Sequence, residues 1–547
     1  MSSPLDRLRA AWYGSRLYGA SLHARPPKAF RQAVDLGHPG DGALADAIFQ
    51  GRFAFAGETP GPGQKPWEGE MSDAASAEAH AFDWLRHVAA AGGATAQRYA
   101  RELVAAWIKD HGGYRPIAWR PDVLAGRIVV WLGHAKFLAG DEAADAEFKA
   151  RILASLGAQA SHLARVAAAA PDGAPRLRSA LALALSGAVL EGGDRRIEQG
   201  LALLEREIAR QILADGGHVE RSPSLQLAIM RELSLLRRAL IEVGREVPVA
   251  LAHAIDRMAP MLRLFRLGDG ALGVFNGGNA ESREAVDLAL ARADARGKPL
   301  DEAPLAGFQR LALGRTTIVL DAGAPPAGAF GRVAHAGALA FEMSVWRDRL
   351  IVNCGMARGA GPEWRRALRG TAAHSTLAIG ETESSEIGEP EGFGKRRASV
   401  VVARRTGEGA IWIDASHDGW ADVNGARHVR RLYLGPEGGD FRGEDRIEAA
   451  TGRKLDRAKG AGFAIRFHLH PGVRASLLGD GAQALLRLPS GGGWSFHATG
   501  AARLALEESV YFGEGGERSR AEQLVLAGEI GETGADIQWR FASLDEG

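Results

Sequence analysis

The chain has 547 residues, of which 46% are hydrophobic and 24% are charged, so it is long enough for two large globular domains. Its 67 basic and 66 acidic residues nearly cancel, which excludes a global field that would drive binding to nucleic acid or to an anionic membrane. A single cysteine excludes an intramolecular disulfide, and no run of about 18 apolar residues is present to span a membrane.

The first 75 residues show mixed patterns and are assigned to an N-terminal wrapping segment. The stretch GETPGPGQKPWEGE, residues 57–70, is rich in glycine and proline, so it predicts a loop and not a regular helix. The N-terminus has no apolar core of the kind found in signal peptides, and we therefore expect a cytoplasmic protein.

Residues 76–267 show the three- and four-residue spacing of apolar side chains that is typical of amphipathic helices, with glycine or proline at most junctions, and the helical domain is assigned to residues 76–307. The helices that this pattern predicts are Ala77–Ala91, Thr95–Lys109, Pro121–Leu138, Asp141–Ala170, Pro175–Glu191, Arg195–Ile212, Ser222–Val243 and Val249–Phe265. Because consecutive helices follow one another without strands, the segment predicts an (α/α) toroid of helical hairpins.

From residue 308 the period changes to short alternating runs separated by glycine and aspartate turns, which is typical of an antiparallel β-sandwich. The predicted strands are Thr316–Leu320, Ala338–Trp346, Ala398–Ala403, Ile411–Ile413, Val429–Leu434, Gly462–His470, Ala484–Leu488, Trp494–His497, Leu504–Tyr511, Gln523–Leu526 and Ile537–Phe541. The sequence thus predicts an α+β multidomain chain, with the (α/α) toroid at residues 76–307 and the β-sandwich at residues 308–547.

Two loops of the helical region carry groups suited to chemistry. In DGGHVERSP, residues 215–223, Ser222 and Pro223 form a helix start, which places His218, Glu220 and Arg221 on the loop before it. The alternative is a capping loop with a surface ion pair. A second loop, GDGALGVFNGGNAE at residues 268–281, contains Asn276, which either contacts a ligand or belongs to two tight turns.

The segment from residue 331 to residue 379 holds two histidines, His335 and His374, each beside a strand-like run. A third apolar run between them ends at Asn353 and Cys354. Two neutral imidazoles with one oxygen or sulfur donor would form a Zn site. Histidines at strand ends are also common as hydrogen-bonded structural residues, so the spacing leaves both interpretations open.

Basic and aromatic residues near His374 suit an acidic sugar. Arg365 and Arg369 offer guanidinium forks for carboxylate or sulfate, and Trp364 offers a face for a sugar ring. The alternatives are a solvated surface and a core or rim tryptophan. Arg430 and Arg431 are adjacent on a predicted strand and must therefore face opposite sides of the sheet.

These segments resemble the heparinase II/III-like polysaccharide lyase family. The resemblance rests on AHAGALAFE (334–342), DRLIVNCG (348–355) and RGTAAHST (369–376), and it extends more loosely over most of the chain. It implies the predicted toroid and sandwich. It also implies a structural Zn held by His335, residue 353 and His374. Asn353 stands where relatives carry an Asp-type ligand, and the Cys354 thiolate is the substitute donor.

The resemblance further implies β-elimination of a uronate-containing glycan, with or without sulfate. In this interpretation His218 neutralises the uronate carboxylate or acts as base, Glu220 positions substrate, Arg221 supplies positive charge, and His335 completes the catalytic set. Asn276, Arg365, Arg369 and Trp364 are the substrate-binding candidates. Relatives use a catalytic tyrosine, whereas this chain has none between Tyr114 and Tyr433.

Three functions remain open at this point. The first is a polysaccharide lyase, and the second is a non-catalytic or divergent glycan-binding protein on the same scaffold. The third is a glycoside hydrolase, which needs paired carboxylates; Glu220 is available, but no partner stands out. The expected partner is a polysaccharide or oligosaccharide, with neither nucleic acid nor membrane. The oligomeric state is open, a homodimer included, and the resemblance makes the periplasm the alternative compartment.

Overall fold

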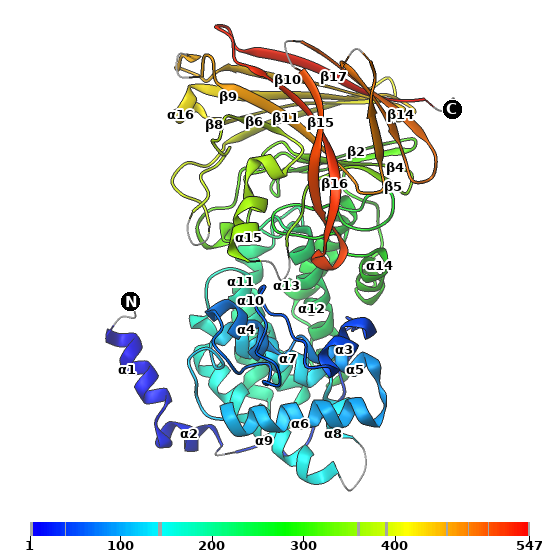
Figure 1. Ribbon diagram of the computed structural model, residues 1–547. Helices are drawn as coiled ribbons and strands as arrows, with labels where there is room; N and C mark the ends of the chain where they lie inside the picture. The colour runs from blue at the N-terminus through cyan, green and yellow to red at the C-terminus, as the bar shows by residue number, and fades with distance from the viewer. Residues whose placement is uncertain are drawn as a thin grey trace. The chain divides into compact units, whose positions relative to one another are not determined.

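The computed structural model describes residues 4–23, 25–38, 40–140, 145–357, 361–388, 392–455, 458–479, 481–500 and 503–544 (Figure 1). The chain divides into two compact units. The first comprises Met1–Gln211, Ile229–Ile255 and Gly359–Gly361, and the second comprises Ile212–Ala228, Asp256–Arg358 and Pro362–Gly547. The boundary predicted between residues 307 and 308 falls inside the second unit, which also takes in the two candidate loops of the helical region.

The first unit is helical. Its elements are α1 (Pro4–Tyr13), α2 (Arg16–Leu22), α3 (Gly42–Phe49), α4 (Asp73–Ala81), α5 (Leu85–Ala91), α6 (Gly93–His111), α7 (Pro121–Gly133), α8 (Ala135–Ala139), α9 (Ala146–Val166), α10 (Ala174–Val189), α11 (Asp194–Gln211) and parts of α12 (Pro223–Glu242) and α13 (Val249–Leu264). In the part of the chain that the structure describes, no helix is both long enough and apolar enough to cross a membrane.

The predicted helices match α4 to α13 closely, with three local differences. The helix predicted at Pro121–Leu138 is divided at His134 into α7 and α8. The helix predicted at Ala77–Ala91 is divided into α4 and α5 because Phe82 adopts a left-handed conformation, with φ of 66°. The helix predicted from Asp141 begins at Ala146, and residues 141–144 lie outside the described residues. Helices α1 to α3 were not predicted, because the first 75 residues show no sustained apolar period.

Small residues allow close packing at the centre of this unit. Helix α10 is rich in alanine and is almost entirely buried. Gly200 of α11 lies so near α10 that a Cβ atom there would come within 2.4 Å of the Ala184 nitrogen. Arg127 is also fully buried, and its guanidinium donates to Gln159 and to the carbonyl oxygens of His80 and Ala118. Each buried donor therefore has an acceptor, as burial of a charge requires.

The second unit contains α14 (Arg283–Arg292), α15 (Pro362–Arg369), α16 (Ala421–Asn424) and, among its described residues, two antiparallel sheets. The first sheet has the order β1-β2-β3-β4-β5-β11-β16-β15, with β6 paired to β11, and the second has the order β12-β13-β14-β17-β10-β9-β8-β7.

The strands of the first sheet are β1 (Glu302–Ala303), β2 (Phe308–Leu313), β3 (Thr316–Asp321), β4 (Phe341–Val345), β5 (Asp348–Val352), β6 (Leu377–Ile379), β11 (Gly462–Leu469), β15 (Arg503–Phe512) and β16 (Arg518–Glu529). Those of the second sheet are β7 (Val400–Gly407), β8 (Ala410–Trp420), β9 (Ala426–Leu434), β10 (Asp440–Ala449), β12 (Arg474–Leu477), β13 (Gln483–Arg487), β14 (Gly493–Gly500) and β17 (Ala535–Ser543). The helical region followed by two antiparallel sheets is the architecture that the sequence predicted.

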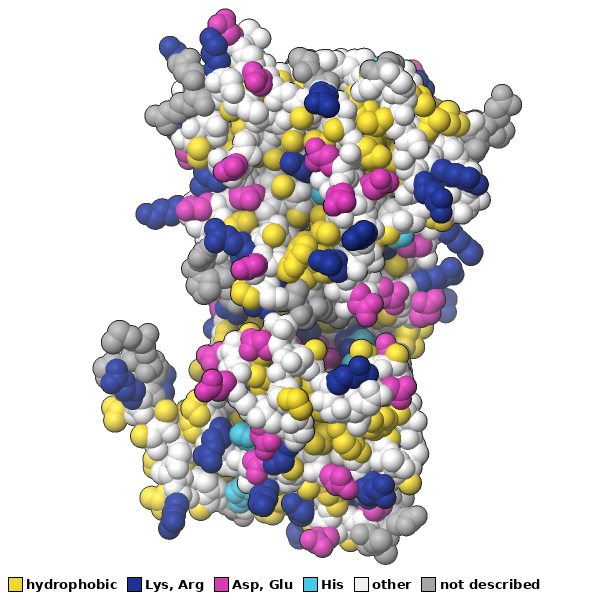
Figure 2. Space-filling model, in the orientation of Figure 1, with side chains coloured by type: hydrophobic (Ala, Val, Ile, Leu, Met, Phe, Trp, Pro, Cys, Tyr) yellow, Lys and Arg dark blue, Asp and Glu magenta, His cyan; other side chains and the backbone are white. Residues whose placement is uncertain are grey.

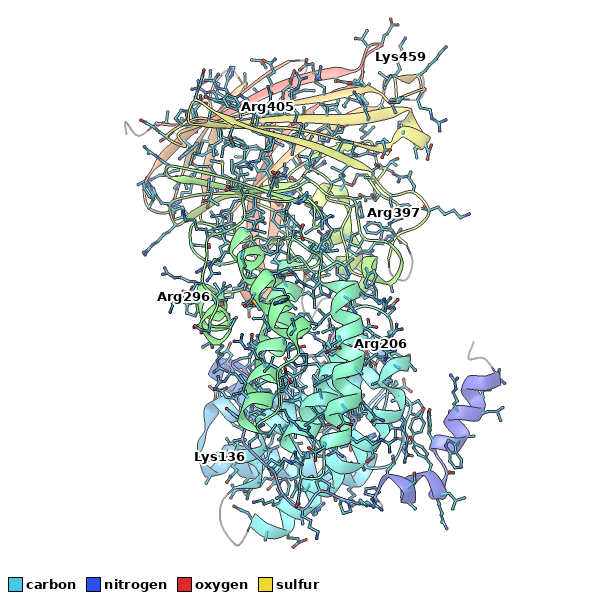
Figure 3. The ribbon with its side chains drawn as sticks, turned by 180° about the vertical axis from the view of Figure 1, so that it is seen from behind. Lys136, Arg206, Arg296, Arg397, Arg405 and Lys459 are labelled. Carbon is cyan, nitrogen blue, oxygen red and sulfur yellow. The ribbon has the colours of Figure 1, made fainter. Side chains whose placement is uncertain are left out.

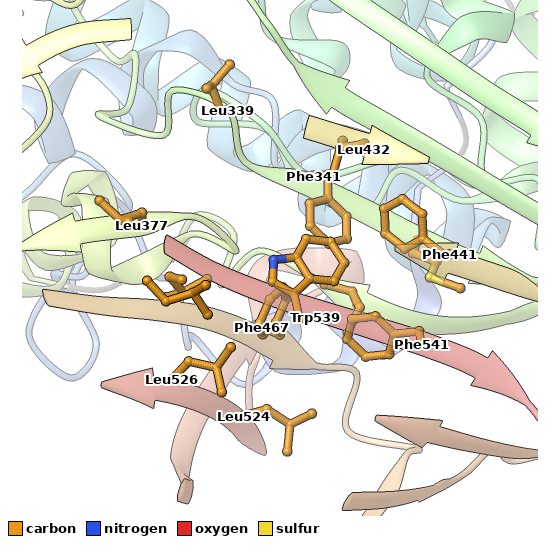
Figure 4. Packing of buried hydrophobic residues seen from close by; sticks show 14 of the residues in the cluster. Leu339, Phe341, Leu377, Leu432, Phe441, Phe467, Leu524, Leu526, Trp539 and Phe541 are labelled. Carbon is orange, nitrogen blue, oxygen red and sulfur yellow. The ribbon is translucent and has the colours of Figure 1, made fainter. Parts of the chain in front are cut away.

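One hydrophobic core fills the space between the two sheets, because alternate residues of each strand point inward. Aromatic rings from both sheets meet in it (Figure 4). Phe341 of the first sheet stacks on Trp539 of the second at a centroid distance of 5.8 Å, and Phe467 meets Trp539 edge-on at 4.9 Å. On the surface shown in Figure 2, cationic and anionic side chains are interspersed, in keeping with the nearly balanced charge.

The core also contains a buried ionic cluster. Asp445 of β10 accepts hydrogen bonds from Arg430 Nε at 2.7 Å, His428 Nε2 at 2.6 Å and Trp539 Nε1 at 2.7 Å. Although burial opposes ionisation, Arg430 and His428 hold the pKa of Asp445 well below its usual range. Arg430 Nη1 also donates to the carbonyl oxygens of Leu339 and Ser375, at 2.8 Å and 3.0 Å. The cluster therefore connects the second sheet to segments that flank both histidines.

Replacing Arg430 tests this cluster. We expect Arg430→Met to lower the free energy of unfolding by about 3–5 kcal/mol, because it leaves the buried Asp445 without its main countercharge. The matched control is Arg431→Met, whose exposed guanidinium pairs with Asp414 and Glu444 and whose loss should cost less than about 1 kcal/mol. Urea unfolding followed by tryptophan fluorescence measures both, and equal effects would contradict the prediction.

Candidate functional site

The loop before α12 is closed by hydrogen bonds to its own backbone. The backbone N–H of His218 donates to Gln226 Oε1 at 2.8 Å, and the backbone N–H of Glu220 donates to His218 Nδ1 at 3.2 Å. Both His218 and Glu220 are buried. Because His218 Nδ1 is an acceptor, the neutral ring carries its proton on Nε2 and can donate from that atom.

Arg221 adopts a left-handed conformation, with φ of 60°, and its guanidinium turns toward the start of the β-sheet region. It donates to Ala306 O at 2.7 Å, to Gly307 O and Gly323 O at 3.1 Å, and to the carboxylate of Asp321. The positive charge of Arg221 is therefore neutralised by Asp321 within the chain. The sequence predicted a cation for a substrate carboxylate here, whereas the geometry gives Arg221 a structural partner.

Asn276 connects this loop to His335. Its Nδ2 donates to Asp321 Oδ2 at 3.1 Å and to Arg221 O at 3.3 Å, and its Oδ1 accepts the backbone N–H of His335 at 3.2 Å. Asp321 thus binds both predicted side chains, although the sequence reasoning missed it. The available signal was a carboxylate at the end of the apolar run of β3, where an uncompensated charge would be costly.

The two histidines form a directed pair. His374 Nδ1 donates to Gly370 O at 2.8 Å, so its Nε2 accepts a hydrogen bond from His335 Nδ1 at 3.1 Å. This arrangement places the lone pair of neutral His335 on Nε2, which is buried and has no hydrogen-bond partner among the described residues. Burial lowers the pKa of His374 to about 4 and that of His335 well below its usual range, so both rings are neutral near pH 7.

Asn353 fastens the end of β5 to two neighbouring segments. Its Nδ2 donates to Val274 O and its Oδ1 accepts the backbone N–H of Ser375, both at 3.0 Å. Its own backbone N–H donates to Glu342 Oε1 at 2.9 Å. Glu342 is fully buried, which raises its pKa to about 7 despite the guanidinium of Arg349 at 3.8 Å. The sequence reasoning gave no role to Glu342.

Cys354 belongs to a separate group. Its Sγ lies 3.5 Å from His468 Nδ1 and 3.9 Å from Ser509 Oγ, and the same His468 nitrogen lies 2.8 Å from that hydroxyl. Burial raises the pKa of Cys354 to about 12, so the thiol stays protonated at neutral pH. The polar side chains that contact the Cys354 Sγ are thus those of His468 and Ser509, and not those of His335 and His374.

The donors around His335 and His374 differ from the zinc site that the resemblance implies. The facing nitrogens of His335 and His374 are 3.1 Å apart, near the ~3.3 Å expected for two ligands of one tetrahedral Zn²⁺. Both ends of the Asn353 amide, however, are bound to the backbone. Among the described residues, no three His, Cys, Asp or Glu side chains gather as a metal-binding group. The residues present therefore do not fit a three-ligand zinc site.

The remaining candidates lie on α15. Arg369 Nε donates to Ala334 O at 3.1 Å, and thereby holds the segment just before His335. Trp364 packs edge-on against Phe512 at 5.5 Å, with Arg518 over its ring, while Arg365 is half-buried on the same helix. The structure thus joins His218, Glu220 and Arg221 through Asn276 and Asp321 to His335 and His374. The ring of Trp364 contacts Phe512 of β15 and Arg518 of β16 instead.

Restoring a carboxylate tests the zinc interpretation. We expect the wild-type protein to retain well under one equivalent of Zn²⁺ after dialysis. Asn353→Asp should approach one equivalent, because a carboxylate then joins the two neutral imidazoles as the third ligand. Elemental analysis of purified protein measures this, and Asn353→Asp combined with His374→Ala is the control that should lose the metal. One equivalent in the wild type would show that our assignment of Asn353 is wrong.

Comparison with known proteins places these residues in a familiar scaffold. The family model described as heparinase II/III-like, C-terminal, matches residues 295–540. The chain is 33% identical over 559 residues to FtsZ-localized protein C of Caulobacter vibrioides, covering 98% of this chain and 94% of the relative.

Two solved structures share the fold. Heparinase III matches with a TM-score of 0.75 at 14% identity, covering 99% of this chain and 91% of its own. The heparan sulfate lyase HepC of Pedobacter heparinus matches with a TM-score of 0.60 at 17% identity, covering 99% and 88%. The scaffold is thus that of glycan lyases, and the full-length likeness to a curated relative agrees with the family model. The chain belongs to the heparinase II/III-like family.

Proposed function

We propose that the protein cleaves an acidic, uronate-containing glycan by β-elimination, with His335 as the base. The observation that carries this proposal is the state of the His335 ring: Nδ1 is fixed by His374, while Nε2 holds a lone pair that no described group uses. A base needs such a directed lone pair, and because Nε2 is buried in the structure, the proposal also requires that substrate binding exposes this atom. The rest of the network supports the backbone around it.

The proposed chemistry assigns one task to each of two imidazole nitrogens. His218 Nε2 donates a hydrogen bond to the uronate carboxylate and so makes the C5 proton more acidic. His335 Nε2 takes that proton, the C5–H electron pair forms the C4–C5 double bond, and the C4–O4 bond breaks. The imidazolium of His335 then returns the proton to O4 of the departing sugar. The same ring serves as base and acid, which replaces the tyrosine of relatives.

The arginine and the asparagine of this network are bound within the chain. Arg221 and Asn276 are bound to Asp321 and to backbone carbonyl oxygens, so neither is placed to neutralise a substrate. Carboxylate recognition therefore falls to His218, a neutral donor. A neutral donor stabilises the developing charge less than a guanidinium would, so we expect slow turnover. The lyase names of the structural relatives support the uronate class of substrate.

Release of unsaturated uronate tests the proposal. We expect absorbance of unsaturated product from at least one member of a panel of heparan sulfate, chondroitin sulfate, hyaluronan and alginate. His335→Ala should reduce the rate by at least about 10²-fold, because the proton-accepting atom is lost. His253→Ala, an exposed histidine of the helical unit, is the matched control and should retain full activity. No product from any substrate, or unchanged turnover in His335→Ala, would contradict the proposal.

A second candidate function is glycan binding without cleavage by a protein that localises with FtsZ. Two observations favour it: the 33% identity along the whole chain to FtsZ-localized protein C, and the internal use of the Arg221 and Asn276 side chains. In this function the network preserves the shape of a lyase site while its polar groups hold the loops together.

The second candidate predicts a different pair of results. Purified protein should bind immobilised FtsZ with saturable affinity and should yield no unsaturated product from the glycan panel. His335→Ala should leave the FtsZ affinity within about twofold, because loss of this buried side chain changes only local interactions at the glycan site. Surface plasmon resonance against FtsZ, with serum albumin as the reference surface, measures this. Absence of binding together with product formation would favour the lyase alone.

A further inference from the structure

A continuous row of side chains crosses the outer face of the second sheet. Its members are direct partners in the strand register, so they lie on the same face and side by side. We call it the cross-strand row. It runs over β7, β8, β9, β10, β17 and β14 and consists of Arg405, Trp412, Tyr433, Arg442, Arg540 and His497.

The row faces away from the core. Its neighbours along the strands, among them Ile413, Phe441 and Phe541, point inward and belong to the hydrophobic core, so the row points outward. Six adjacent strands at about 4.8 Å spacing give the row a length of about 24 Å. It lies in an open groove of about 970 Å³. Arg405 at one end of the row is labelled on the sheet in Figure 3.

The groove has an excess of positive charge. Six arginines and two acidic residues line it. Arg442 and Arg540 are direct cross-strand partners, and such like-charged neighbours are destabilising unless an anion lies between them. Asp440 accepts from both, at 2.5 Å and 2.7 Å. Even with Asp440 and Glu448 included, six guanidiniums share four carboxylates, which leaves a surplus of two.

Two aromatic rings lie in the middle of the cationic row. Trp412 and Tyr433 are partly exposed, with their centroids 5.3 Å apart and their planes tilted by 49°. The Arg442 guanidinium lies 5.5 Å from the Tyr433 ring centroid. Exposed aromatic faces beside guanidiniums offer an apolar surface and anion-binding forks to the same ligand. The combination suits a ligand that has both flat apolar faces and negative charges.

We propose that the cross-strand row binds an acidic oligosaccharide, whose rings pack on Trp412 and Tyr433 and whose carboxylates or sulfates meet Arg405, Arg442 and Arg540. Strands β8, β9, β10, β17 and β14 are each paired on both sides, so across these five strands the row has no open backbone edge to which a peptide strand could add; β7, which carries Arg405, lies at the edge of the sheet. Recognition must come from side chains, and guanidinium forks match carboxylate and sulfate in two-point contacts. The row is separate from the His335 network and does not depend on cleavage.

The test is a titration of the full-length protein with hexasaccharides, followed by calorimetry and tryptophan fluorescence. Heparin and hyaluronan hexasaccharides supply sulfate with carboxylate and carboxylate alone, and maltohexaose is the neutral control. Arg442→Ala should raise Kd for the acidic probes at least about tenfold. Arg453→Ala is the matched control: it has nearly the same exposure, 55% against 56%, and likewise pairs with one carboxylate, so its Kd should change less than about twofold.

Further measurements separate the outcomes. Trp412→Ala should weaken binding and reduce the fluorescence change, and thermal unfolding of each variant checks the fold. Arg442→Ala should release the same amount of unsaturated uronate as the wild type, so the binding row and the cleavage site are tested independently. Binding of heparin alone identifies sulfate as the anion, and binding of both acidic probes shows that carboxylate suffices. Equal affinities for Arg442→Ala and Arg453→Ala, equal binding of maltohexaose, or equal displacement by poly-glutamate would overturn the proposal.

Discussion

The ionised carboxylate of Asp445, fully buried between two sheets, is the constraint on which the β unit depends. It is tolerable only because Arg430 and His428 donate to it within 2.7 Å. Once fixed there, Arg430 has a donor left, and that donor reaches the carbonyl oxygens of Leu339 and Ser375. The charge that the core must neutralise therefore also sets the path of the segments on which His335 and His374 lie.

The candidate site repeats the same principle on a smaller scale. Asp321 neutralises Arg221 and orients Asn276, and Asn276 in turn holds the backbone of His335. Asp321 binds the side chains of Arg221 and Asn276, and Asn276 binds the backbone of His335, so hydrogen bonds between side chains and to the backbone draw these segments together. The side chains that look most suited to catalysis are largely the ones that build the site, which leaves His335 Nε2 as its distinctive free atom.

Sequence alone predicted the helices from α4 to α13 and most strands because their apolar periods are regular; the longest strand that it missed is β10. The inward positions of β10 include Gly443 and Asp445, which are not apolar residues and so interrupt the alternating pattern. The strand forms because Trp539 fills the space over Gly443 and Arg430 neutralises Asp445. The opposite orientations of Arg430 and Arg431 were predictable from strand geometry. The partners of Arg221 and Asn353 were not, since hydrogen bonds between distant segments leave no local pattern.

The amide at position 353 changes what the site requires from its surroundings. Its two ends bind Val274 and Ser375, so the turn after β5 is closed by atoms that the chain itself provides. A carboxylate in the same place would repel the Val274 carbonyl oxygen and would need a cation for balance. With Asn353 the segment is held by hydrogen bonds to Val274 and Ser375. The folded protein should consequently be indifferent to chelators and to fluctuations in metal supply within its compartment.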